Sequence, residues 1–176
     1  MRDKLLSKIN WSGNESVLDI GCGRGLMVIG AAKKLTSGKA YGVDIWQGKD
    51  LSGNSYDSTM KNVDIENVSD KVFIKTADMR ELPFEDGSID IVISSTAIHN
   101  LKESKDRSIV IKEIVRVLKP GGIALIDDIR FSADYKNDLL KYGCKDAEDI
   151  SSFLSKLFTI LITFGSLRPG TIKAKK

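Results

Sequence analysis

The sequence predicts an α/β fold, a doubly wound and mostly parallel sheet of seven strands with helices on both faces. Short β-branched runs alternate with segments of helical periodicity, which is typical of parallel strands joined by helices. The final segments instead indicate an antiparallel hairpin at the end of the sheet. Connection rules favour the strand order 3-2-1-4-5-7-6, which leaves a crevice at the carboxyl ends of the strands.

Five short apolar segments are the expected parallel strands: residues 16–20, 40–44, 72–76, 89–94 and 122–127. The segments with helical patterns are residues 4–9, 26–35, 56–66, 105–118 and 133–142. For the helix over 105–118, Ser104 is the expected N-cap, and the segment Pro120-Gly121-Gly122 is the expected stop. Gly143 occupies the position of a C-cap for the helix that precedes it.

The C-terminal hairpin is expected from three adjoining segments. Residues 157–164 form a continuous run rich in β-formers, residues 165–169 supply turn residues, and residues 170–174 can return as a second strand. The sequence therefore predicts that the last two strands of the sheet lie on either side of this turn.

The composition indicates one globular domain over residues 1–176. Apolar residues make up 41% of the chain and charged residues 29%, as in ordinary soluble domains. The net charge of +3 is a small difference between 27 basic and 24 acidic residues, so it gives no nucleic-acid footprint. We therefore do not expect a nucleic-acid partner.

The cysteines and the single histidine indicate a reducing compartment and no metal site. Cys22 and Cys144 lack the spacing of metal ligands, and we expect both to be reduced thiols in a cytoplasmic protein. No run of 18 apolar residues occurs, and the first nine residues are too charged for a signal peptide. We expect no membrane span in this chain.

The glycine-rich segment over residues 17–25 (VLDIGCGRG) is the most informative motif. Gly21, Gly23 and Gly25 follow an apolar strand and precede a helix, and glycine lets the backbone approach a ligand closely. A turn built for a pyrophosphate would gain nothing from the acid at Asp19, whereas a ligand carrying an ammonium group would. Asp19 therefore favours a cationic ligand.

Two further acids fall at strand ends and predict a nucleoside site. Asp44 lies about 20 residues beyond the glycine turn, where a carboxylate can accept hydrogen bonds from both ribose hydroxyls. Ile45 and Trp46 offer apolar faces to an adenine ring. Asp78 can accept from the exocyclic amine of that ring, and the backbone N–H of Met79 can donate to a ring nitrogen. Alone, each feature also has an ordinary structural reading, as tight packing, a solvated strand end or a loop cap.

These segments resemble the motifs of class I S-adenosylmethionine-dependent methyltransferases. Residues 17–25 resemble the first motif, residues 42–44 the ribose-binding acid, and residues 76–83 the adenine contact. Residues 82–92 (LPFEDGSIDIV) resemble the fourth-strand motif, and residues 116–122 (RVLKPGG) the turn into the fifth strand. The C-terminal hairpin is similar to the reversed seventh strand of the family.

The resemblance implies S-adenosylmethionine as the cofactor, with S-adenosylhomocysteine as the product. The implied transfer is an in-line displacement at the methyl carbon, with Asp19 balancing the α-ammonium group. His99 could serve as a base and Asp128 could orient an acceptor, although each has a structural alternative. The cofactor-binding residues expected on these grounds are Asp19, Gly21, Cys22, Gly23, Gly25, Asp44, Ile45, Trp46, Asp78, Met79, Ser94 and Ser95.

The acceptor and the assembly stay open at this stage. A small molecule is preferred as acceptor over a protein and over RNA, and a homodimer is one option for the assembly. An NAD(P)-dependent oxidoreductase is a rival, but Leu26 stands where its Gly-x-Gly-x-x-Gly motif needs the third glycine. A non-catalytic module that binds S-adenosylmethionine is the second rival.

Overall fold

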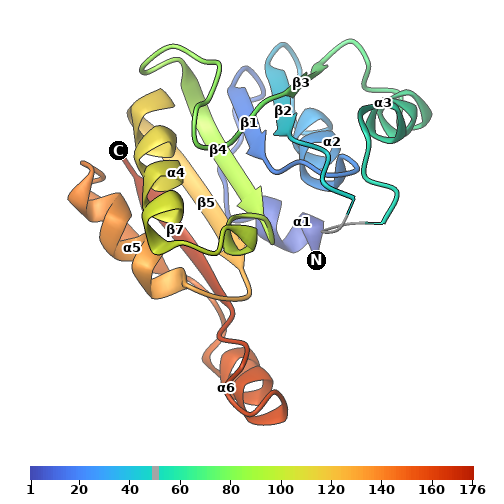
Figure 1. The fold of residues 1–176 in the computed structure, drawn as a ribbon. Helices are drawn as coiled ribbons and strands as arrows, with labels where there is room; N and C mark the ends of the chain where they lie inside the picture. Colours follow the sequence, from blue (N-terminus) through green and yellow to red (C-terminus); the bar gives the residue numbers. More distant parts are fainter. Residues whose placement is uncertain (49–51) are drawn as a thin grey trace.

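A computed structural model describes residues 1–48 and 52–176 of the chain, and it confirms the expected sheet (Figure 1). The seven strands lie in the order β3-β2-β1-β4-β5-β7-β6. The parallel part contains β1 (Ser16–Ile20), β2 (Lys39–Asp44), β3 (Val72–Thr76), β4 (Ile89–Ser95) and β5 (Leu118–Asp128). These bounds match the expected strands closely, except that β5 begins four residues earlier than predicted.

The order in which successive strands are added to the sheet reverses beside β1. This strand pairs in parallel with β2 on one side, with Leu18 opposite Tyr41, and with β4 on the other, with Leu18 opposite Val92. From β1 the chain continues outward to β2 and β3, and then returns to form β4 and β5 on the opposite side. Such a reversal opens a crevice at the carboxyl ends of β1 and β4.

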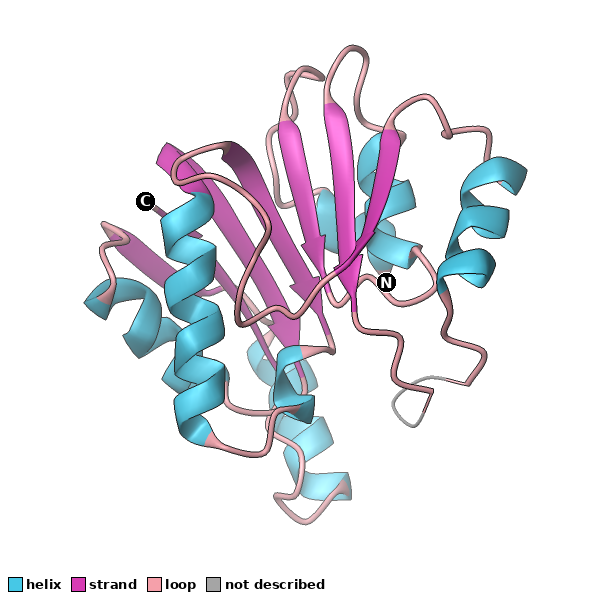
Figure 2. Ribbon diagram, turned by 45° about the horizontal axis from the view of Figure 1, so that its top comes forward, coloured by secondary structure: helices cyan, strands magenta, loops and turns pink. Residues whose placement is uncertain are grey.

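Helices cover both faces of the sheet (Figure 2). One face packs against α1 (Arg2–Leu6), α2 (Leu26–Ala32) and α3 (Tyr56–Ile65). The other packs against α4 (Ser104–Val117) and α5 (Ser132–Lys141). A short 3-10 helix, η1 (Ile98–Asn100), follows β4. Each face has its own apolar core because the central strands are buried on both sides, as parallel strands usually are.

The predicted helix boundary near Pro120 is wrong in detail. Glu103, rather than Ser104, is the N-cap of α4, and the helix ends at Val117. The strand β5 then runs through Pro120 and Gly121. Proline is tolerated there because Pro120 lies in an irregular stretch of the β4–β5 ladder, between the pairs Ile89–Leu118 and Ile91–Ile123.

The C-terminal hairpin exists, but its first strand is not residues 157–164. That segment lies mainly in a helix, α6 (Phe153–Ile162), and the outer strand is β6 (Asp146–Asp149), which pairs with β7 (Gly170–Lys175). Asp146 lies opposite Lys175 and Glu148 opposite Lys173, and opposite charges stabilise cross-strand pairs. Most of the apolar run is helical instead, with its backbone hydrogen bonds formed along α6.

In the described part of the chain, we find no helix with the length and apolar character needed to cross a bilayer.

Candidate functional site

The glycine turn between β1 and α2 is packed tightly against the loop that follows β4. The backbone N–H groups of Gly21 and Cys22 both donate to the Val43 carbonyl, which ties the turn to β2. Gly21 has a φ of +68°, and a Cβ atom placed on it would lie 2.4 Å from the Cβ of Ala97. Only glycine fits this position, for reasons of both backbone conformation and space.

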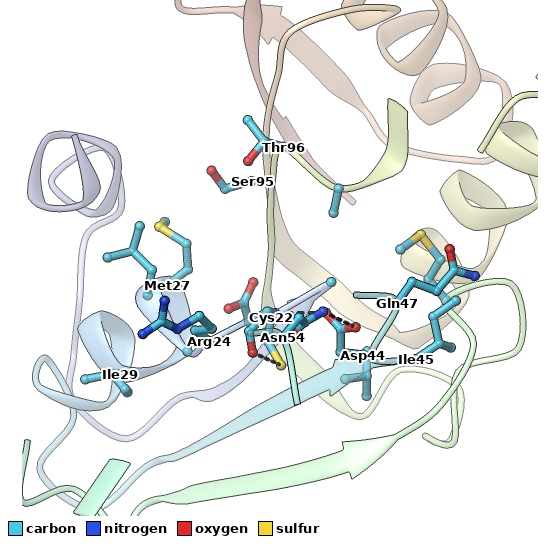
Figure 3. Close-up of a pocket in the computed structure, with 18 of the residues that line it drawn as sticks. Cys22, Arg24, Met27, Ile29, Asp44, Ile45, Gln47, Asn54, Ser95 and Thr96 are labelled. Atoms are coloured by element: carbon cyan, nitrogen blue, oxygen red, sulfur yellow. Dashed lines mark hydrogen bonds between the residues drawn. The ribbon is translucent and has the colours of Figure 1, made fainter. Parts of the chain in front are cut away.

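The turn forms one wall of a cavity of about 600 Å³ at the carboxyl ends of the strands (Figure 3). Figure 3 shows Arg24 and Met27 on one side of it, Ile45 and Gln47 on another, and Ser95 and Thr96 across the opening. Ten of the twelve residues predicted to bind the cofactor line this cavity: Asp19, Gly21, Cys22, Gly23, Gly25, Asp44, Ile45, Asp78, Met79 and Ser95.

Asp19 is the buried carboxylate of the cavity. It is only 1% exposed, and its Oδ2 accepts a hydrogen bond from the Val28 N–H in the first turn of α2, at 2.9 Å. Burial raises the pKa of Asp19 to about 7, since the hydrogen bond from Val28 only partly offsets the loss of hydration. No basic side chain in the described part of the chain forms an ion pair with Asp19, so a cationic group of a ligand would stabilise its charged form.

Asp44 and Asn54 form a polar pair at the end of β2 (Figure 3). Asp44 accepts from the Gly23 N–H at 2.8 Å, from the Trp46 N–H at 2.7 Å and from the Asn54 Nδ2 at 3.3 Å. The Asn54 Oδ1 is buried and has no hydrogen-bond partner among the described residues. A buried amide oxygen is costly to leave unpaired, so Asn54 is suited to receive a hydroxyl group of a ligand.

Asp78 lines the cavity beside Met79 and Arg80, in the segment after β3. Its Oδ2 lies 2.6 Å from the Nη2 of Arg80, and the hydrogen bond to this guanidinium lowers the pKa of Asp78. The three acids Asp19, Asp44 and Asp78 thus border one cavity. Their roles toward a ligand stay predictions.

Trp46 and Ser94 do not line the cavity with the other predicted residues. Trp46 has a φ of +58°, and its Nε1 donates to the Thr76 Oγ1 at 2.7 Å, so the indole lies along β3. The side chain of Ser94 is buried, and its hydroxyl donates to the Ile20 carbonyl at 3.1 Å. These contacts give Trp46 a role in strand packing and Ser94 a role in joining β4 to β1.

His99 and Asp128 also lie outside the cavity lining, where they form a buried polar cluster. The Nδ1 of His99 lies 2.6 Å from the Oδ1 of Asp128. The His99 backbone N–H and the Tyr135 hydroxyl both donate to Asp128 Oδ2, at 3.1 and 3.3 Å. Burial raises the pKa of Asp128, although His99 opposes the shift. The cluster joins η1, β5 and α5.

We expect His99→Asn to lower the free energy of unfolding by about 1–3 kcal/mol, because it removes the imidazole group that lies against the buried Asp128 carboxyl. Denaturant unfolding measures this, and the variants Asp128→Asn and His99→Asn with their double mutant give the coupling between the two residues. Affinity for S-adenosylhomocysteine should stay within about twofold of the wild type. Unchanged turnover with normal cofactor binding would remove His99 from the mechanism.

Several cavity residues carry no signal in the sequence motifs. Arg2 projects from α1 and Arg24 from the glycine turn, and Asn62 lies on α3. The Asn62 Nδ2 donates to the Arg24 carbonyl at 2.9 Å, so α3 supports the turn. The only sequence cue for Arg24 is its place between two glycines, and Asn54 lies in an irregular loop where spacing predicts nothing.

Residues 18–126 match the family described as the methyltransferase domain, a range that begins within β1, contains the glycine turn and ends within β5. The chain belongs to the methyltransferase domain family. The match supports a fold of the kind found in class I S-adenosylmethionine-dependent methyltransferases. It disfavours the alternative of an NAD(P)-dependent oxidoreductase.

Two curated relatives illustrate the family. A sterol 4-C-methyltransferase of Caenorhabditis elegans is 35% identical over 76% of this chain and 37% of its own length. A demethylmenaquinone methyltransferase of Lactiplantibacillus plantarum is 31% identical over 68% of this chain and 47% of its own length. This methyltransferase domain therefore spans less than half the length of either relative.

A solved S-adenosylmethionine-dependent methyltransferase from Aquifex aeolicus shares the fold. It aligns with a TM-score of 0.72 over 99% of this chain and 88% of its own, at 17% identity. This likeness supports the arrangement of the seven-stranded sheet in the methyltransferase domain.

Proposed function

We propose that this chain transfers a methyl group from S-adenosylmethionine to a small-molecule acceptor. The observation that carries the proposal is one cavity bordered by Asp19, Asp44 and Asp78, with the side-chain oxygen of Asn54 beside them, which has no hydrogen-bond partner among residues 1–48 and 52–176. These groups come from the ends of adjacent parallel strands and the loops that follow them. Together they offer acceptors for every donor of an adenosyl sulfonium with an amino acid tail.

The residues fit the cofactor group by group. Asp19 would balance the α-ammonium, because its buried carboxylate lacks a cation. Asp44 and Asn54 would accept the ribose hydroxyls, and Asp78 would accept the adenine amine. Gly21 and its neighbours let the backbone run along the ligand, since any Cβ at Gly21 would overlap Ala97. Arg24, on the same wall, can approach the carboxylate of the ligand.

The bound cofactor would supply a methyl group already activated by the positive sulfur. The residues of this chain would then act by alignment and by exclusion of water, and no covalent enzyme intermediate is needed. Too many carboxylates near the sulfur would stabilise the reactant cation and slow the transfer. The three acids are suited to the ammonium, ribose and adenine ends of the ligand, which leaves the sulfur free of a paired anion.

A small-molecule acceptor is supported by the two relatives, whose names describe methyl transfer to a sterol and to demethylmenaquinone. The net charge of +3, spread over 27 basic and 24 acidic residues, gives no support for nucleic acid as the acceptor. A base is needed only if the acceptor must lose a proton, and His99 is the candidate that the sequence offers for that case.

S-Adenosylhomocysteine should stabilise the protein against unfolding, by about 2.7 kcal/mol at a ligand concentration one hundred times its Kd. Thermal unfolding measures this, with NADH as the matched control ligand. Selective stabilisation by NADH would contradict the proposal.

Incubation of extracts with methyl-labelled donor then reports whether label moves to a small molecule, a protein or RNA. Binding without transfer to any of them would favour the non-catalytic module instead.

A further inference from the structure

Helix α6 projects from the domain and buries little of its apolar surface (Figure 1). Six large apolar side chains on it are between 43% and 75% exposed: Phe153, Leu154, Leu157, Phe158, Leu161 and Ile162. Their spacing of one, three and four places them along one broad face, with Lys156, Thr159 and Thr163 on the other side. A contiguous apolar patch of this kind marks an interaction surface.

The turn after α6 adds a further exposed aromatic residue. The Gly165 N–H donates to the Ile160 carbonyl, and the Phe164 N–H donates to the Leu161 carbonyl. These are the two hydrogen bonds of a Schellman motif. Phe164 therefore has a φ of +50°, a conformation that favours glycine, and its ring is 98% exposed. Packing within this chain does not explain a bulky aromatic at this position.

Helix α6 and the cavity both lie at the carboxyl ends of the parallel strands. The segment that carries it returns at Arg168, whose N–H donates to the Ile129 carbonyl just beyond β5. The first residue of β7, Gly170, then pairs with Asp128, the last residue of β5. Figure 1 shows α6 extending beyond the carboxyl ends of the strands, where the glycine turn also lies.

The charges around α6 are mostly basic. From residue 150 to residue 169 the sequence contains two basic residues, Lys156 and Arg168, and no Asp or Glu. Lys156 is paired with Asp149, but Arg130 and Arg168 are exposed at the base of the helix. An anionic surface would therefore meet apolar side chains flanked by arginine, the combination that interfacial helices use.

We propose that α6 and the turn after it bind the surface of an anionic lipid bilayer. The helix has ten residues and is about 15 Å long, half of what a membrane span requires, so it would lie in the plane of the interface. A second copy of the chain is a poorer occupant. A single helix of this length offers much less than the roughly 800 Å² per partner of a standard stable interface.

The test is flotation of the full chain with vesicles of phosphatidylglycerol and, in parallel, of phosphatidylcholine. We expect binding to phosphatidylglycerol vesicles, weaker binding to phosphatidylcholine, and a loss of at least about tenfold in affinity for Phe158→Ser/Leu161→Ser. Leu140→Ser on α5 is the matched control, because Leu140 is 43% exposed and lies on another helix. Arg168→Glu should weaken binding to phosphatidylglycerol vesicles and leave binding to phosphatidylcholine vesicles unchanged.

Every other outcome overturns the proposal. Flotation that is absent with both vesicles excludes a lipid surface, and flotation that the double variant does not change excludes α6. A dimer seen by light scattering that dissociates in Phe158→Ser/Leu161→Ser, without vesicle binding, would assign the helix to a second copy. S-Adenosylhomocysteine binding, measured separately, should be equal in all variants, so this test is independent of the proposed methyl transfer.

Discussion

Asp19→Asn should weaken the binding of S-adenosylhomocysteine by about 10-fold to 100-fold at pH 8, the value of one charge-assisted contact in a buried site. Because the pKa of Asp19 is raised to about 7, the wild-type carboxyl is largely ionised at pH 8 and largely protonated at pH 6. Wild-type affinity should therefore fall about tenfold between these pH values. Calorimetric titration of both proteins measures this, and Asp19→Asn should show little dependence on pH.

The ligand-free protein gives an independent check of opposite sign. The folded state holds the Asp19 proton more tightly than the unfolded chain, whose carboxyl has a pKa of 3.8. Stability from this group is therefore present at low pH and lost as pH rises toward 7, by up to about 4 kcal/mol. The asparagine side chain of the variant Asp19→Asn does not ionise. As pH rises from 4 to 8, the unfolding free energy of the wild type should therefore fall relative to that of the variant. A constant difference from pH 4 to pH 8 would contradict the role of Asp19.

Gly21→Ala should lower the free energy of unfolding by about 3 kcal/mol. The variant adds a Cβ atom 2.4 Å from the Cβ of Ala97, which forces the turn or the loop after β4 to move. It also places a side chain at a φ of +68°, where alanine is disfavoured by about 1–2 kcal/mol. Denaturant unfolding measures the loss, and binding of S-adenosylhomocysteine should weaken as well.

Gly53→Ala separates the two causes. Gly53 has a φ of +69°, almost the same as Gly21, but a Cβ atom there would meet no atom of the described residues within 4 Å. The control should therefore lose about 1–2 kcal/mol from backbone conformation alone. Equal losses in the two variants would show that overlap with Ala97 contributes nothing.

The parallel part of the fold was predictable because each buried strand is a short apolar run bounded by turn residues. The C-terminal part was harder. Residues 157–164 have strand-like composition, yet the partner of β7 is the acidic segment Asp146–Asp149, whose charges complement Lys173 and Lys175. The composition of residues 157–164 predicted a strand, but a different segment pairs with β7. Strand propensity depends strongly on tertiary contacts, which composition does not show.

The site was predictable where the strand ends and the glycines determine it. Asp19, Asp44 and Asp78 follow directly from strand positions, and they share one cavity. The positions of Trp46 and His99 could not be predicted, because the direction of each side chain depends on local backbone geometry. Trp46 has a positive φ, and His99 lies in a 3-10 turn beside Asp128. Asn54 was missed because no pattern marks a loop residue whose amide lies against a carboxylate.

The pairing of β6 with β7 bears on the segment that joins these two strands. The Ile150 N–H donates to the Thr171 carbonyl, so the β6–β7 ladder is already joined below the segment that carries α6. The residues between the two strands, 151–169, form no pair in the β5–β7 or β6–β7 register. Residues 151–169 are therefore an insertion between two paired strands, and a change in their length or sequence leaves the pairing of β5, β6 and β7 intact.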